Sequence, residues 1–426
     1  MLKTKQQKNR PYAIVIGLDT MQGLQTARIL ASHNIPVIAF VRDPKHHACR
    51  SRVCDKILQV DTTSHELITS LQEFGPTLLG KAVLYPCHDQ CVALISKNRE
   101  QLANWYHIVM ADADVMETMM SKQRFYTLAE ANGVPYPKTL LLETRADAEA
   151  AASNLCFPCV IKPVRRSSRW DEMTMAKAFR VENADEFLSL YDRVNGWAPA
   201  LMAQQWIEGT DADLYSCNCY FSRRSTLVAS FVAKKLRQWP PRTGSSCLGE
   251  ECRNDTVLAE VVRIFENVGY VGLGYIEVKR DPRTGIHYAI EANVGRPTGR
   301  SAIAEAGGVD MLYAMYCDAL GLSLPSNLEQ QYLGVKWIDL RHDIQSALYY
   351  FRRNELTIAD WYRSLRGRKA FAVFSWSDPL PFLVDIWRAF SVLLSREERA
   401  KRRHSSNGGS KGTAPVTVNT RKEANS

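Results

Sequence analysis

The sequence has 426 residues, of which 46% are hydrophobic and 23% are charged, a composition typical of a soluble globular protein with two or three domains. Its net charge of +9 comes from the two ends of the chain. Residues 1–10 carry four basic and no acidic side chains, and residues 396–426 carry eight basic and three acidic ones. The long segment between them is neutral, which excludes a basic nucleic-acid platform. Both ends are predicted to be disordered tails.

Several features predict a cytoplasmic location. The first twelve residues lack the apolar core of a signal peptide, and no apolar run reaches transmembrane length. The eleven cysteines are an odd number in a chain without a secretory signal, which favours reduced thiols. Cys156 and Cys159 have the spacing of a redox or metal motif, but no second cysteine pair or histidine cluster completes it, so a structural role is expected.

The first domain is predicted to be a Rossmann-like parallel sheet over residues 11–115. A strand at 12–16, a helix at 18–33 and a strand at 35–40 form a βαβ unit. The glycines that follow the first strand do not match a dinucleotide fingerprint. A later strand at 82–85 leads to Asp89 at the carboxyl edge of the sheet, where such sheets bind ligands. Asp89 is equally compatible with substrate contact and with a helix N-cap.

Basic side chains mark the middle of the chain. A Ser-capped helix begins at Lys122, and Lys162 lies inside an apolar strand at 157–164, where a lysine needs an anionic partner such as a phosphate. The polar segment 165–170 is compatible with a flap over phosphates or with a solvated turn, and Lys177 lies on the next strand. A strand at 201–209 precedes a run of strands through residue 232. Residues 234–245 are predicted to be a basic loop, suited to an anionic small molecule.

The segment 272–300 is predicted to be a hairpin that carries a metal site. Its strands place Glu277 close to Glu291, with Asn293 pointing to the same side. Two carboxylates and a carboxamide on one face are costly unless a cation lies between them, and oxygen ligands favour Mg²⁺. A solvated hairpin face is the alternative, although Arg296 and Arg300 follow immediately.

These parts occur in an order that resembles the ATP-grasp carboxylate–amine ligases, in the branch of the D-aspartate ligases and carbamoyl-phosphate synthases. The resemblance covers residues 11 to about 320. It implies an N-terminal Rossmann-like pre-ATP-grasp domain, then a two-subdomain ATP-grasp domain at 116–325 whose lid covers about 125–200 and whose metal-bearing part covers about 201–325. A small C-terminal extension at 326–395 would follow. Nucleotide contacts are implied for Lys122, Lys162, Lys177, Gln204, Gln205, Trp206 and Ile207, with the ribose held by Asp211 or Asp213.

The resemblance also implies a reaction. Mg²⁺ or Mn²⁺ on Glu277, Glu291 and Asn293 would hold ATP, a substrate carboxylate would be phosphorylated, and an amine would displace the phosphate. Arg296, Arg300 and Arg237 would hold the transferred phosphoryl group or the substrate carboxylate. Two alternatives remain open: a carboxylase or phosphoryl-transfer relative of the same fold, and a non-catalytic nucleotide-binding regulatory protein.

The extension ends in an apolar and aromatic segment at 383–394, followed by basic residues. This segment could lie on an anionic membrane surface as an amphipathic helix. Alternatively, it could pack on the body of the protein or on the partner of a homodimer.

Overall fold

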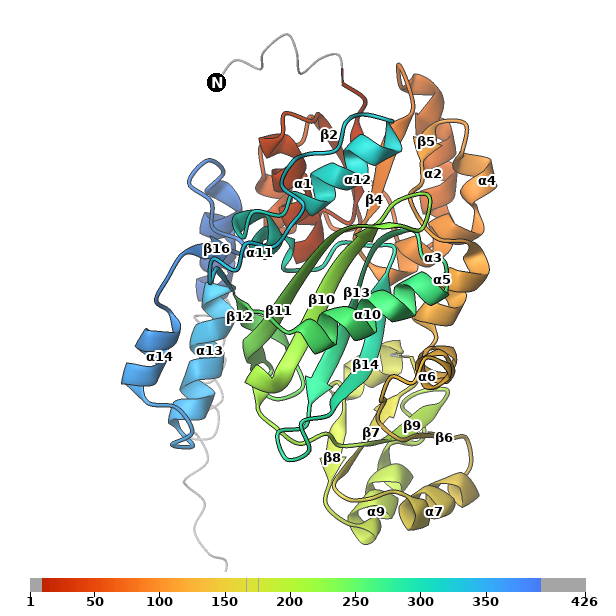
Figure 1. Cartoon of the computed structure of the whole chain (residues 1–426), viewed down its shortest axis with the longest axis vertical. Helices are drawn as coiled ribbons and strands as arrows, with labels where there is room; N and C mark the ends of the chain where they lie inside the picture. Colours follow the sequence, from red (N-terminus) through yellow and green to blue (C-terminus); the bar gives the residue numbers. More distant parts are fainter. Residues whose placement is uncertain (1–9, 166, 175, 392–426) are drawn as a thin grey trace, which may run out of the picture.

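A computed structural model describes residues 10–165, 167–174 and 176–391. The predicted C-terminal tail, most of the N-terminal one and the end of the 383–394 segment lie outside these ranges. The described chain forms three β-sheets, which Figure 1 shows with the N-terminal sheet above, the largest sheet in the middle and the smallest below. No helix among the described residues is long and apolar enough to cross a membrane.

The first sheet is parallel, with strand order β3-β2-β1-β4-β5, as predicted. Every side chain of β1 is buried, because helices cover both faces of a doubly wound sheet. The segment from residue 89 to residue 102 forms two helices, divided at Asn98. The elements are β1 (Ala13–Ile16), α1 (Met21–Ser32), β2 (Val37–Val41), η2 (His47–Arg50), β3 (Lys56–Gln59), α2 (Glu66–Phe74), η3 (Gly75–Thr77), β4 (Ala82–Pro86), α3 (Asp89–Lys97), α4 (Arg99–Leu102) and β5 (Tyr106–His107).

The second sheet has four strands in the order β6-β9-β7-β8. Two helices pack against each other beside it, as Figure 1 shows for α7 and α9. The predicted polar loop near 165–170 contains the start of a short helix, because Ser167 caps α8 and Trp170 is buried against Phe179 and Trp197. The elements are α5 (Ala113–Met120), α6 (Lys122–Ala131), β6 (Thr139–Leu142), α7 (Arg145–Asn154), β7 (Cys159–Pro163), α8 (Ser168–Met173), β8 (Phe179–Val181), α9 (Ala184–Val194) and β9 (Leu201–Gln205).

The third sheet has seven strands in the order β14-β13-β10-β11-β12-β15-β16. Residues 234–239, predicted as loop, continue a strand. The segment after residue 300 forms two helices, separated at Gly307 and Gly308. The elements are η4 (Asp211–Asp213), β10 (Leu214–Phe221), β11 (Leu227–Trp239), β12 (Ser245–Glu251), α10 (Asp255–Asn267), β13 (Gly272–Arg280), β14 (His287–Val294), α11 (Ser301–Ala306), α12 (Met311–Ala319), β15 (Lys336–Ile338), α13 (Leu340–Phe351), α14 (Ile358–Ser364) and β16 (Lys369–Phe371).

The C-terminal extension is built into this sheet. Strand β15 pairs with β12, and β16 pairs with β15 in parallel. The segment expected as a separate small unit therefore supplies the outer strands of the largest sheet, and helix α13 packs on β11 and β12.

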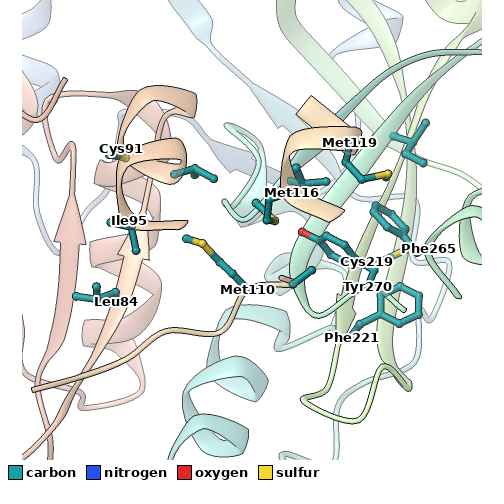
Figure 2. Close-up of a cluster of buried hydrophobic side chains, with 14 of the residues drawn as sticks. Leu84, Cys91, Ile95, Met110, Met116, Met119, Cys219, Phe221, Phe265 and Tyr270 are labelled. Atoms are coloured by element: carbon teal, nitrogen blue, oxygen red, sulfur yellow. The ribbon is translucent and has the colours of Figure 1, made fainter. Parts of the chain in front are cut away.

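One continuous core joins the N-terminal sheet to the seven-stranded sheet. Figure 2 shows Met110 and Met116 between the side chains of the first domain and the aromatic side chains around Tyr270. All of these belong to one cluster of buried residues. Methionine side chains adapt to irregular gaps, so the first sheet is held firmly against the largest one. This packing fixes Asp89 beside the end of strand β14.

Candidate active site

A cavity of about 780 Å³ lies between the four-stranded and seven-stranded sheets. Three parts of the chain line it: the N-terminal domain through Met21, Gln22 and Asp89, the lid, and the inner face of the seven-stranded sheet. Most of the nucleotide and metal residues predicted from sequence line this cavity, namely Lys122, Lys162, Lys177, Gln204, Gln205, Trp206, Ile207, Glu277, Glu291, Asn293, Arg296 and Arg300.

The predicted hairpin is present, and it places the two carboxylates opposite each other. Glu277 on β13 is the register partner of Glu291 on β14, and Tyr275 is the partner of Asn293. The turn between the strands contains Gly285 at φ +74°, a conformation that glycine adopts without strain. Because alternate residues of a strand share a face, Glu291 and Asn293 project to the same side.

Each of these three oxygen-bearing side chains faces a basic side chain. Lys235 Nζ lies 3.0 Å from Glu277 Oε2. Lys122 Nζ lies 3.9 Å from Glu291 Oε2. Arg296 Nη2 donates to Asn293 Oδ1 at 2.5 Å. Lys235 and Lys122 thus offset the negative charge of the two carboxylates, as a divalent ion would.

The electrostatics of Glu277 agree with a cation-binding role. Burial raises the pKa of this carboxyl, but the opposing effect of Lys235 and Arg300 is larger, so the pKa is below its ordinary value. The group is therefore ionised near neutral pH. Two carboxylates and an amide oxygen are hard donors that suit Mg²⁺ or Mn²⁺. The buried Asn293 Nδ2 has no hydrogen-bond partner and, as a donor, suits an anionic group beside the metal. The residues present fit a divalent metal ion.

Lys162 on β7 has a neutral hydrogen-bond partner. Its Nζ donates to Gln204 Oε1 at 2.6 Å, and Gln204 is fixed in turn by Tyr126 and Thr139. Burial, with a further contribution from Lys122, lowers the pKa of Lys162 to about 7. A buried lysine whose charge is only partly offset is a good site for a phosphate.

The lid and the large sheet meet across the cavity. Lys177 Nζ donates to Ser245 Oγ at 3.3 Å, which joins the lid to β12. At the end of β9, the backbone N–H of Gln205 donates to Lys138 O at 2.9 Å. The guanidinium of Arg180 lies 5.1 Å from the ring centre of Trp206, the next residue. Gln205, Trp206 and Ile207 therefore form a fixed wall of the cavity.

Two arginines follow the hairpin, as predicted, and both are buried beside the cavity. Arg296 Nε donates to Asp89 Oδ1 at 2.5 Å and its Nη1 donates to the hydroxyl of Tyr275 at 3.2 Å. Arg300 donates to Ser216, while its Nη1 has no partner. Burial lowers the pKa of Arg300 despite the charge of Glu277. Of the two readings of Asp89, the N-cap is wrong, because His88 caps α3.

Three predicted site residues have other partners in the structure. Arg237 is absent from the cavity lining, since its Nε and Nη2 donate to both oxygens of the fully buried Asp343 on α13. Asp211 accepts hydrogen bonds from Gln238 and Tyr350. Asp213 caps the turn at Thr210. None of the three lines the cavity, and in the structure they stabilise the junction between β11, η4 and α13; the roles predicted for them stay predictions.

Lys235 was not predicted as a partner of Glu277, because it was interpreted as part of a basic loop. It is buried on β11 with Ala233 and Arg237, while Lys234 and Leu236 between them are partly exposed. No apolar–polar alternation marks this part of the sequence, so the strand gave no clear signal. Asp339 and His342 were also missed. They line the cavity, with Nδ1 of His342 2.7 Å from Oδ2 of Asp339. No motif in the sequence indicated that a segment beyond residue 325 reaches the site.

Comparison with known proteins supports the fold. No family model matches the chain. It is 24% identical over 231 residues to the D-aspartate ligase of Enterococcus faecium, a match that covers 52% of this chain and 54% of the relative. It resembles the biotin carboxylase domain of the Hydrogenobacter thermophilus 2-oxoglutarate carboxylase, in complex with MgADP and bicarbonate, with a TM-score of 0.59, 14% identity and coverage of 74% and 71%. An L-amino acid ligase from Bacillus licheniformis gives a TM-score of 0.55, 14% identity and coverage of 73% and 74%.

These matches confirm the predicted resemblance to ATP-grasp enzymes and the predicted fold class, an N-terminal Rossmann-like domain followed by two ATP-grasp subdomains. The match to the D-aspartate ligase spans about half the length of that relative. The similar solved structures share 11 to 16% identity with this chain, so they show a likeness of fold alone.

Proposed function

We propose that this protein is an ATP-dependent ligase that joins a carboxylate to an amine through an acyl phosphate, with release of ADP and phosphate. One observation carries the proposal. Glu277, Glu291 and Asn293 share a cavity with Lys122 and Lys162, so a metal-binding wall faces two lysines suited to phosphates. The name of the matched D-aspartate ligase and that of the L-amino acid ligase with the same fold support it.

ATP would lie between the lid and the large sheet. Lys122 and Lys162 would bind its phosphates, and the wall of Gln205, Trp206 and Ile207 would contact the adenine. A Mg²⁺ or Mn²⁺ ion would be held by Glu277, Glu291 and Asn293, and when bound it supplies charge neutralisation at the β- and γ-phosphates. Displacement of Lys235 and Arg296 from these oxygens would free both cations for anionic substrate groups.

The proposed reaction has two steps. A carboxylate oxygen of the first substrate attacks the γ-phosphorus, the bond to the ADP oxygen breaks, and an acyl phosphate forms. The nitrogen of the amine then attacks the acyl carbon, the carbon–oxygen bond to phosphate breaks, and the amine proton is lost to solvent or to a nearby base. Arg296 and Arg300 would orient the anionic groups, which is the main task in phosphoryl transfer.

A cytoplasmic location remains part of the proposal. All eleven cysteines, which lie among the described residues, are free thiols, as expected in a reducing compartment. A homodimer stays a prediction.

The experiment that tests the proposed function is a panel of candidate carboxylic acids incubated with ATP, Mg²⁺ and hydroxylamine. Hydroxylamine traps an acyl phosphate as a hydroxamate, so the amine substrate need not be known. D-Aspartate, other amino acids and bicarbonate belong in the panel. We expect an acid that yields both ADP and hydroxamate, with a loss of about a hundredfold or more in Glu291→Gln, which removes one metal-binding charge.

The matched control is Glu73→Gln, an isosteric change at an exposed position of α2. It should retain the activity of the unmodified protein. ADP release with bicarbonate alone and no hydroxamate with any other acid would favour the carboxylase alternative. Absence of nucleotide binding would favour the regulatory alternative.

A further inference from the structure

Exposed apolar side chains are concentrated in the C-terminal part of the described chain. Of twenty large apolar side chains that are exposed, eleven lie between residues 340 and 390. This part includes α13 and α14, which Figure 1 places on the side of the molecule away from the lid helices α7 and α9. Contiguous apolar surface of this kind marks a site of interaction.

The helix at 380–391 carries the clearest apolar stripe. Leu383, Ile386, Trp387 and Phe390 are all exposed, Trp387 at 71%, and their spacing of three and four residues places them on one face. The opposite face is tied to the body of the protein. Asp385 pairs with Arg341 at 3.2 Å and with His47 at 3.6 Å. The helix therefore packs on the protein through Asp385 and Phe382 and presents the stripe outward.

A fixed loop before this helix presents a second tryptophan. Trp376 is 89% exposed. The loop around it is held by Arg28, which donates to Val373 O and Asp378 O, both at 2.7 Å. Asp378 also accepts from Ser51 Oγ at 2.6 Å. An exposed tryptophan on an anchored loop loses little conformational entropy when it binds.

Aromatic contacts join this loop to the helix. The ring of Phe374 lies 4.8 Å from that of Trp376 and 5.2 Å from that of Phe382 at the start of the helix. Trp376 and the helix stripe are therefore parts of one surface, which we call the C-terminal apolar surface. It consists of Trp376, Leu383, Ile386, Trp387 and Phe390.

The sequence of this part of the chain is basic. Residues 340–391 contain eight basic and five acidic side chains, and three of those acids, Asp343, Asp378 and Asp385, are buried. The following residues, 392–426, contain a further eight basic and three acidic side chains. A second copy of the chain would bring like charges together across a symmetric contact, whereas an anionic lipid surface is complementary.

We propose that the C-terminal apolar surface binds the face of an anionic lipid bilayer, with Trp376, Trp387 and Phe390 inserted at the headgroup level. Tryptophan favours that level of a membrane. Stable peripheral binding requires both the insertion of apolar side chains and electrostatic attraction. The loop with Trp376 and the apolar stripe of the helix supply the first, and the neighbouring basic sequence supplies the second. This inference does not rest on the proposed ligase reaction.

The test is co-sedimentation of the full chain with vesicles. One set contains phosphatidylglycerol and phosphatidylcholine, and the other contains phosphatidylcholine alone. We expect the protein to sediment with the anionic vesicles and to be released as salt is raised. The double variant Trp376→Ser, Trp387→Ser should bind about tenfold more weakly or worse. Since both side chains are exposed, the variant should fold and retain ADP formation in the absence of vesicles.

The matched control changes two exposed leucines elsewhere, Leu79→Ser and Leu322→Ser, and should bind vesicles normally. Failure of the unmodified protein to bind anionic vesicles at low salt would overturn the proposal, as would equal binding of the double variant. A dimer in solution that the double variant converts to monomers, without vesicle binding, would assign the surface to a second copy instead.

Discussion

At the scale of single residues, basic side chains contact the carboxylate and amide oxygens of the cavity. In the proposed reaction these contacts would be exchanged for contacts with a metal ion and a nucleotide. Glu277 and Asn293 each contact a buried cationic side chain, while the charge of Lys162 is met only by the neutral Gln204. Basic side chains contact the oxygens proposed to bind the metal, and Lys162, proposed to bind a phosphate, has a neutral hydrogen-bond partner. Binding of a metal–nucleotide complex would improve the pairing of all of these groups at once.

Lys162 gives a prediction about pH. Its pKa of about 7 lies below the value for a free lysine, so the side chain is mostly neutral at a pH of about 8. A bound phosphate favours the charged form and raises the pKa, so nucleotide binding should take up about one proton at that pH and much less at about pH 6. Calorimetry of ADP binding in buffers of different ionisation enthalpy measures this uptake.

The affinity for nucleotide should accordingly fall as the pH rises above 7, by up to about tenfold per unit. The control is Lys162→Arg, in which the cation cannot be lost and proton uptake should disappear. Equal proton uptake in the variant and in the unmodified protein would show that another group titrates.

At the scale of secondary-structure elements, the hairpin depends on a close approach between β13 and the chain before α5. Gly272 begins β13 at φ +100°, and an added Cβ would lie 2.4 Å from the backbone oxygen of Val109. Only a residue without a side chain fits there. This contact, with the bridge between Met110 and Gly272, holds the start of β13 to the N-terminal domain.

Gly272→Ala should therefore destabilise the protein by more than the cost of a positive φ alone, which is about 1–2 kcal/mol. Gly285→Ala is the matched control, because Gly285 also has a positive φ but no atom lies within 4 Å of an added Cβ. Chemical denaturation of both variants measures the difference. Equal loss of stability would show that the clash with Val109 is relieved by a backbone shift.

Elements with a strong local pattern could be predicted from the sequence, whereas long-range partners could not. Alternation and turn chemistry were sufficient for the hairpin and the pairing of Glu277 with Glu291. The contact of Arg237 with Asp343 could not be predicted, because Asp343 lies 106 residues further along the chain. The contribution of β15 and β16 to the largest sheet is equally non-local, since a three-residue strand carries little periodic signal.

At the scale of the whole molecule, the C-terminal part of the chain contributes to two regions. The cavity between the lid and the large sheet holds the residues proposed to bind the metal and the phosphates, and Asp339 and His342 also line it. The C-terminal apolar surface lies on the segment after β16, which contacts the N-terminal domain through Arg28 and His47. The C-terminal part therefore belongs to the body of the protein as well as to the proposed membrane contact.

Formation of an acyl phosphate is tested most directly by tracing a carboxylate oxygen of the substrate into the released phosphate. An acid that gives a hydroxamate would be supplied with ¹⁸O in its carboxylate, together with ATP and Mg²⁺, and the released phosphate would be analysed by mass spectrometry. We expect one ¹⁸O atom in each phosphate, because the carboxylate oxygen that attacks the γ-phosphorus leaves with it. Amide or hydroxamate formed together with unlabelled phosphate would rule out an acyl phosphate.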